Sequence, residues 1–163
     1  MMIAVIGLLV GGGGVLVGAV SVGVTAFWMM RTKMMIPVRS SRTFEETCAA
    51  IEETVPKHEG WGFPKPPFDM YEKLAEKGQQ PDGVNKIRQY YVCKPTVAKR
   101  VLSHSPFISA MMPCTWSVYE HADGTVWISK MNVGLMSKIF PNEVRTAMAE
   151  VASAEKTMLA AVL

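Results

Sequence analysis

The chain has 163 residues, a formal net charge of +3 at pH 7 and 49% hydrophobic residues. All 17 Lys and Arg residues and all 14 Asp and Glu residues follow Met30, so an uncharged leader precedes a charged remainder. That remainder of about 130 residues suffices for one modest hydrophobic core. The composition excludes disordered, collagen-like and disulfide-dense proteins, and a single apolar segment is too few for a multi-span transporter.

The uncharged segment from Ile3 to Met30 predicts a single-pass transmembrane helix. As a helix it would extend roughly 42 Å, which exceeds the ~30 Å hydrocarbon core of a bilayer. Trp28, followed by Arg31 and Lys33, is typical of a membrane interface. We therefore assign residues 1–33 to a transmembrane helix with a basic flank.

A cleavable signal peptide is the alternative, because Val24 and Ala26 resemble the small residues that precede a cleavage site. No basic n-region stands before the apolar run, and the run is longer than a usual signal peptide. Four basic residues follow the segment closely: Arg31, Lys33, Arg39 and Arg42. The positive-inside bias therefore favours an inner membrane of a bacterial cell with the following domain in the cytoplasm; the opposite side is the alternative.

Glycines at spacings of four residues predict close packing of this helix against another helix. Five of them are assigned to this packing: Gly7, Gly11, Gly14, Gly18 and Gly23. Small residues on a common helical face let another backbone approach closely within a membrane. The expected partners are other transmembrane subunits, and the alternative is a flexible anchor that contacts only membrane lipid.

The remainder predicts one α+β domain, a small antiparallel sheet packed with helices, at residues 43–163 after a linker at 34–42. In chain order we expect a helix from Phe44 to about Val55 ahead of Pro56, a helix from Phe68 to Lys77, a strand from Ile87 to Cys93, a helix from Thr96 to Ser103, hairpin strands at Thr115–Glu120 and Thr125–Met131, and a helix opening at Pro141. Thr43 and Glu46 have the spacing of a capping box. Asp123-Gly124 predicts the hairpin turn, and Asn142 is expected as an N-cap.

The motifs Val92-Cys93-Lys94-Pro95, Met112-Pro113-Cys114 and Thr115-Trp116-Ser117-Val118-Tyr119-Glu120 resemble those of the DUF302 family. Members carry a Cys-Asn-Pro-type element before a helix and a Pro-Cys-Asn element that opens a strand. The resemblance covers roughly Phe44 to Val133, and two positions depart from it, because Lys94 and Thr115 stand where Asn is usual. It implies a small α+β domain of unknown function and suggests a homodimer through this domain.

Cys93 and Cys114 are the strongest candidates for chemistry. Cys93 ends a predicted strand and Cys114 opens another, so both thiols could meet at one edge of the sheet, near the helix after Pro95. A helix amino terminus can lower the pKa of a thiol, and two thiols together could exchange electrons, carry sulfur or bind a soft metal. The alternative is that both are small buried apolar residues, as Cys48 is expected to be.

We assign no catalytic residues and no metal ligands from the sequence, and any cofactor is unknown. His58, His104 and His121 lack metal-ligand spacing. His104 could join Met111, Met112 and Cys114 in a copper(I) site, but methionines more often fill core space. No basic stripe predicts a nucleic-acid partner.

These patterns favour a non-catalytic accessory subunit of a larger membrane protein complex, anchored by the glycine-rich helix. The glycines and the lack of a catalytic constellation point to this function. The alternative is a membrane-tethered thiol redox or sulfur-handling protein that uses Cys93 and Cys114.

Overall fold

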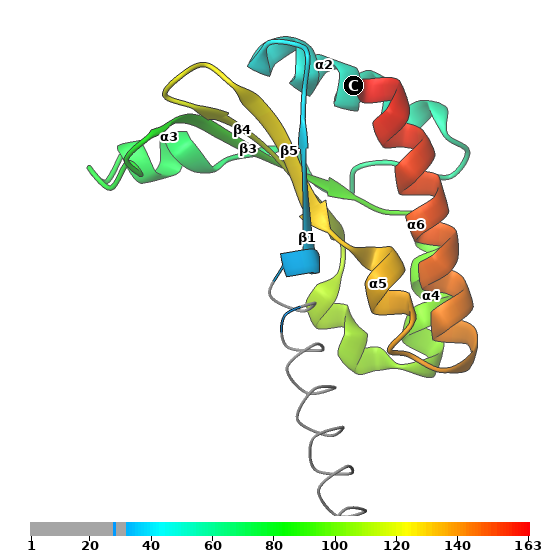
Figure 1. Cartoon of the computed structure of the whole chain (residues 1–163). Coiled ribbons are helices and arrows are strands. Elements are labelled where there is room, and N and C mark those ends of the chain that lie inside the picture. Colours follow the sequence, from blue (N-terminus) through cyan, green and yellow to red (C-terminus); the bar gives the residue numbers. More distant parts are fainter. Residues whose placement is uncertain (1–27, 29–31) are drawn as a thin grey trace, which may run out of the picture. The chain divides into compact units, whose positions relative to one another are not determined.

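The computed structural model describes residue 28 and residues 32–163 (Figure 1). The expected transmembrane helix, apart from Trp28, lies outside these described residues, and so do its glycines and Arg31. Within the described residues, no helix is both long enough and apolar enough to cross a membrane. Residues 35–163 form one compact unit, which is the domain described below.

The domain is built on a five-stranded antiparallel sheet with the strand order β1-β5-β4-β3-β2. The strands are β1 (Met35–Arg39), β2 (Phe68–Asp69), β3 (Val84–Val92), β4 (Cys114–His121) and β5 (Val126–Met131). The predicted hairpin is β4–β5, and its turn places Gly124 at a φ of 81°, a conformation that favours glycine. The α+β class and the antiparallel sheet are thus confirmed.

The helices gather mainly on one side of this sheet (Figure 1). They are α2 (Phe44–Lys57), α3 (Met70–Ala75), α4 (Pro95–His104), the 3-10 helix η1 (Pro106–Met111), α5 (Val133–Ser137) and α6 (Asn142–Val162). Figure 1 shows α2, α4, α5 and α6 on the same side, while α3 lies beside the far end of β3. The helix α2 begins with the predicted capping box, because the Thr43 side chain accepts from Glu46 N and the Glu46 carboxylate accepts from Thr43 N.

The core lies between this helical layer and one face of the sheet. Alternation along the strands directs the same set of side chains to this face, and most are fully buried: Tyr90, Val92, Trp116, Val118, Val126 and Ile128. From the helices, Phe44 and Ile51 of α2 and Met158 of α6 are buried against them. Each such large side chain stabilises the fold by about 1.5–3 kcal/mol through its burial.

The residues expected to form a linker, 34–42, contain the edge strand β1, so that expectation was wrong. Met35 to Arg39 pair in register with Met131 to Trp127 of β5. Pro37 weakens any strand prediction, because proline cannot donate a backbone hydrogen bond. An edge strand tolerates it, since one of its sides has no neighbouring strand.

Several helix boundaries also differ from prediction, and three of them have a clear local cause. The helix α2 does not stop ahead of Pro56 but includes it and ends at Lys57. A proline in the last turn removes only one backbone hydrogen bond, which the helix tolerates. The second helix begins at Met70 because Phe68 and Asp69 pair with β3 as β2, and Asp69 then caps α3 by accepting from Glu72 N. Asn142 is the first residue of α6, with a φ of 51°, and the N-cap is Pro141.

Candidate functional site

The structure brings Cys93 and Cys114 to the same end of the sheet. Cys114 is the first residue of β4 and pairs with Val92 of β3, the residue before Cys93. Cys93 continues past β3 and forms an isolated bridge with Gly62. Both cysteines border one small cavity of about 20 Å³, which Met112 also lines. The predicted proximity of the two cysteines is found, but at the end of the two interior strands β3 and β4 and not at an edge of the sheet.

Both thiols are free and half-buried, and burial raises the pKa of each. For Cys114 the pKa rises to about 12, chiefly through burial and then through the Glu155 carboxylate and Cys93. The expected lowering by the amino terminus of α4 is therefore not found, because loss of solvent dominates around these thiols. At neutral pH both cysteines are protonated, which makes them weak nucleophiles.

Cys48 stands apart from this pair, as predicted. It lies on α2 with 2% of its surface exposed, and burial raises its pKa. Its neighbour Tyr90 is also buried, and the Tyr90 hydroxyl donates to Glu52 Oε1 at 2.9 Å. Burial raises the pKa of Tyr90 strongly, so this phenol is a hydrogen-bond donor at all ordinary pH values.

Methionine residues line two further hollows together with Cys114. A surface hollow of about 350 Å³ is lined by Met35, Met111, Met112, Met131 and Cys114, together with Lys65, Tyr91 and Thr115. A smaller inner cavity of about 50 Å³ is lined by Met111, Met112, Cys114, Met131 and Met148 and by aliphatic side chains. Sequence reasoning singled out Met111 and Met112 but missed the others, because they come from β1, β5 and α6, which only the fold brings together.

A buried ion pair lies close to Cys114. Lys130 Nζ is 2.7 Å from Glu155 Oε2, and the exposed fractions of their side chains are 8% and 1%. Trp116 Nε1 donates to the other carboxylate oxygen at 3.0 Å. The signal for this pair was present in the sequence, because strand alternation places Lys130 on the same face as Ile128 and Val126.

The histidines lie apart from one another. The Nδ1 atoms of His58 and His104 are 3.0 Å and 2.9 Å from the carbonyl oxygens one helical turn earlier, and His121 packs edge-on against Tyr119. His104 does not line the hollow that contains Met111 and Cys114. Across the part of the chain that the structure describes, no three His, Cys, Asp or Glu side chains are placed to hold a metal ion.

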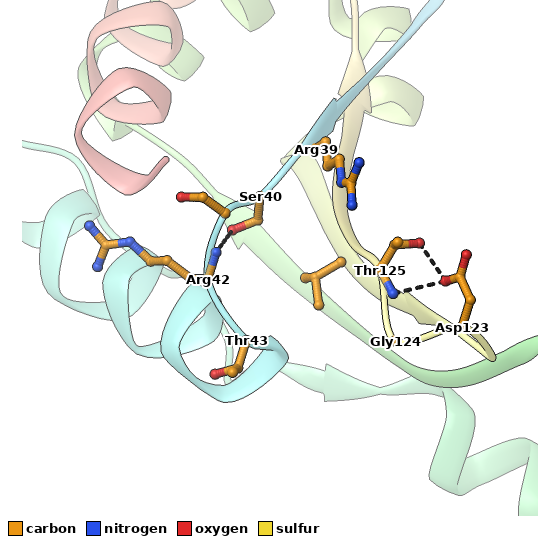
Figure 2. A pocket seen from close by; sticks show the side chains of 9 residues that line it. Arg39, Ser40, Arg42, Thr43, Asp123, Gly124 and Thr125 are labelled. Carbon is orange, nitrogen blue, oxygen red and sulfur yellow. Dashed lines mark hydrogen bonds between the residues drawn. The ribbon is translucent and has the colours of Figure 1, made fainter.

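A further hollow, of about 630 Å³, is a groove between the start of α2 and the β4–β5 turn, lined mainly by polar residues (Figure 2). Two basic residues, Arg39 and Arg42, and one acidic residue, Asp123, are among the residues that line it. Asp123 Oδ1 accepts from both the backbone and the hydroxyl of Thr125, which lowers the pKa of this carboxyl. The hydrogen bonds of Asp123 therefore belong to the hairpin turn.

Large apolar side chains are exposed at the end of the domain where β1 begins, which we call the proximal end. Phe107 of η1 is 72% exposed, Ile139 is 62% exposed and Met35 is 53% exposed. Met35 shares the surface hollow with Met111, the last residue of η1. The rings of Phe107 and Phe140 are 6.5 Å apart, so Ile139 lies beside the same group. Of the expected membrane-interface residues, Trp28 is 57% exposed, Lys33 is exposed, and Arg31 lies outside the described part.

Comparisons with known proteins agree with the fold. The crystal structure of an uncharacterized conserved DUF302 protein from Bacillus stearothermophilus superposes with a TM-score of 0.69 at 25% sequence identity. The match covers 81% of this chain and 100% of that chain. No relative is found among the curated proteins.

The family profile described as "Domain of unknown function DUF302" matches residues 36–163. The match is longer than the resemblance expected from Phe44 to Val133, because it includes β1 and the whole of α6. The family match therefore covers nearly the whole described domain, and the chain belongs to the DUF302 family.

Proposed function

We propose that this chain is a non-catalytic accessory subunit of a larger membrane protein complex, anchored by its glycine-rich amino-terminal segment. The observation that carries the proposal is the group of exposed apolar side chains at the proximal end. Single exposed apolar residues are ordinary, but Phe107, Ile139 and Met35 are each more than half exposed at one end of a small domain. Such a group is typical of a surface that contacts protein or lipid.

The covalent chain supports this use of the proximal end. Met35 is the first residue of β1, and four peptide steps separate it from Arg31, a reach of at most about 14 Å. A membrane-embedded segment that ends near Arg31 would therefore hold the start of β1 close to the membrane interface. Positive-inside bias favours the cytoplasmic side of the inner membrane for the domain.

The experiment is gentle detergent extraction of the tagged full chain from its native membranes, followed by native mass spectrometry. We expect the chain to be recovered with other membrane polypeptides. The double variant F107S/I139S should lose these companions, because it removes the apolar surface. The matched control is F68S, on the edge strand β2 opposite β1, where Phe68 is 38% exposed. Recovery of the wild type only as a monomer or a homodimer would overturn the proposal.

A second candidate function is thiol redox or sulfur handling by Cys93 and Cys114. It is favoured by one observation, namely that both thiols border the same small cavity. Two electrons and two protons passed to an oxidant would convert the pair to a disulfide. Mild oxidation followed by alkylation and mass spectrometry of the native chain tests this function. A reversible Cys93–Cys114 disulfide would support it, and thiols that never pair would exclude it.

A further inference from the structure

Sulfur atoms are concentrated around Cys114. Three adjoining cavities meet there, since each is lined by Met112 and Cys114. Cys93 borders one of them, and Met111 and Met131 border the other two. These residues come from η1 and the residue that follows it, from β4 and β5, and from the residue that follows β3, so the fold and not local sequence assembles them.

We propose that Cys93, Met112 and Cys114 bind a single soft monovalent metal ion of the copper(I) class, with Met111 and Met131 as additional thioether donors. Thiolate and thioether sulfur select copper(I), whereas magnesium, calcium and manganese prefer oxygen ligands. The site is independent of the anchoring function proposed above.

Charge favours a monovalent ion over zinc. The surroundings of the pair are apolar, with Val92, Val97 and Val151 in the cavity wall. The positive charge of Lys94, which also lines this cavity, lies 3.6 Å from Glu150, and Lys130 is paired with Glu155. When the ion binds, a thiol releases its proton to solvent and a sulfur–metal bond forms, so one cation and one thiolate give a neutral unit. Zinc would need both thiols to lose their protons before the unit became neutral, and the cavity lining offers no histidine or carboxylate to complete a tetrahedral zinc site.

The cavities also provide space for the ion and access to it from the surface. The cavity of about 20 Å³ that Cys93 and Cys114 both border is large enough to hold about one water molecule, which suits one ion. The surface hollow of about 350 Å³ has Cys114 in its lining together with Met35, Met111 and Met131. Methionine-lined walls offer an entering copper(I) ion weak ligands on its way inward.

The test uses the full chain in detergent under anaerobic, reducing conditions. Copper(I) is titrated in competition with the chromophoric chelator bicinchoninate. We expect one ion per chain to be withdrawn from the chelator, with a near-ultraviolet thiolate-to-metal absorption band. The C93S/C114S variant should bind roughly 100-fold more weakly or worse, and M112L roughly 10-fold more weakly. The control is C48S, which keeps full affinity because Cys48 lies on α2 away from the cavities.

Two further readouts separate metal binding from a merely structural role. The apparent affinity should rise about 10-fold per pH unit for each thiol proton released on binding. In the wild-type chain, silver(I) or copper(I) should protect Cys93 and Cys114 from alkylation, as located by mass spectrometry, so this result does not depend on any variant folding. Equal copper(I) uptake by wild type and C93S/C114S, or an affinity that does not change with pH, would overturn the proposal.

Discussion

Glu155 on α6 and Lys130 on β5 form an ion pair of 2.7 Å inside the core, where helix meets sheet. Removing one partner of such a pair leaves an uncompensated buried charge. We therefore expect K130M to lower the free energy of unfolding by about 3–5 kcal/mol, measured by urea denaturation.

The double variant K130M/E155Q is the matched control for this pair. It removes both charges, while the side-chain amide oxygen that E155Q introduces can still accept from Trp116 Nε1, which in the wild type donates to Glu155 Oε1 at 3.0 Å. Most of the stability lost in K130M should return, because an uncharged pair avoids the desolvation cost. If the double variant is as unstable as K130M, the loss arises from packing and not from charge.

The capping box at the start of α2 should contribute measurably to stability. T43A removes the acceptor for Glu46 N, and we expect the free energy of unfolding to fall by about 1 kcal/mol. T43S keeps the hydroxyl and should remain close to wild type. Thermal denaturation of both variants measures this difference, and equal melting temperatures for T43A and T43S would contradict it.

Low pH should reduce the stability that the capping box of α2 contributes. The pKa of Glu46 is lowered, first by the hydrogen bond from Thr43 N and then by that from the Thr43 hydroxyl. A carboxyl whose pKa is lower in the folded chain stabilises it above the ordinary pKa, and this contribution is lost as the pH falls through the folded pKa. The stability difference between wild type and E46Q should therefore be present at pH 7 and shrink toward pH 3. A difference that does not change with pH would show that the carboxylate charge is irrelevant.

Alkaline pH should destabilise the domain through Cys114. Burial raises its pKa to about 12, so the unfolded chain loses this proton at lower pH than the folded chain. The contribution is fully present below the ordinary thiol pKa near 9 and is lost as the pH rises toward 12. From pH 9 to 10 the free energy of unfolding should fall by about 1 kcal/mol more in wild type than in C114A. Parallel pH profiles for the two proteins would contradict this.

Local patterns predicted most of the fold. The capping box at Thr43, the Asp123-Gly124 turn and the alternation of β4 and β5 are each encoded within a few residues, and each is found. The strand β1 was missed because Pro37 argues against a strand in general, and only its place at the sheet edge permits it. The strand β2 was missed because two residues carry no periodic signal.

The candidate site was predictable only in part. Cys93 and Cys114 could be placed near each other because they flank strand boundaries. The ring of methionines could not be predicted, since Met35, Met131 and Met148 are distant in sequence and no short-range pattern links them. Whether the pKa values of the two thiols rise or fall could not be predicted either, because the shift depends on how completely other elements exclude water.

The most direct test of the proposed accessory function is native mass spectrometry of gently extracted membranes that contain either the wild-type chain or the variant G14L/G18L. Leucine at these positions would keep the segment apolar but prevent close approach of another helix. We expect the wild-type chain to be found with other membrane polypeptides and G14L/G18L to stay in the membrane without them. Identical assemblies for both proteins, or a mature wild-type chain that starts near Phe27, would contradict it.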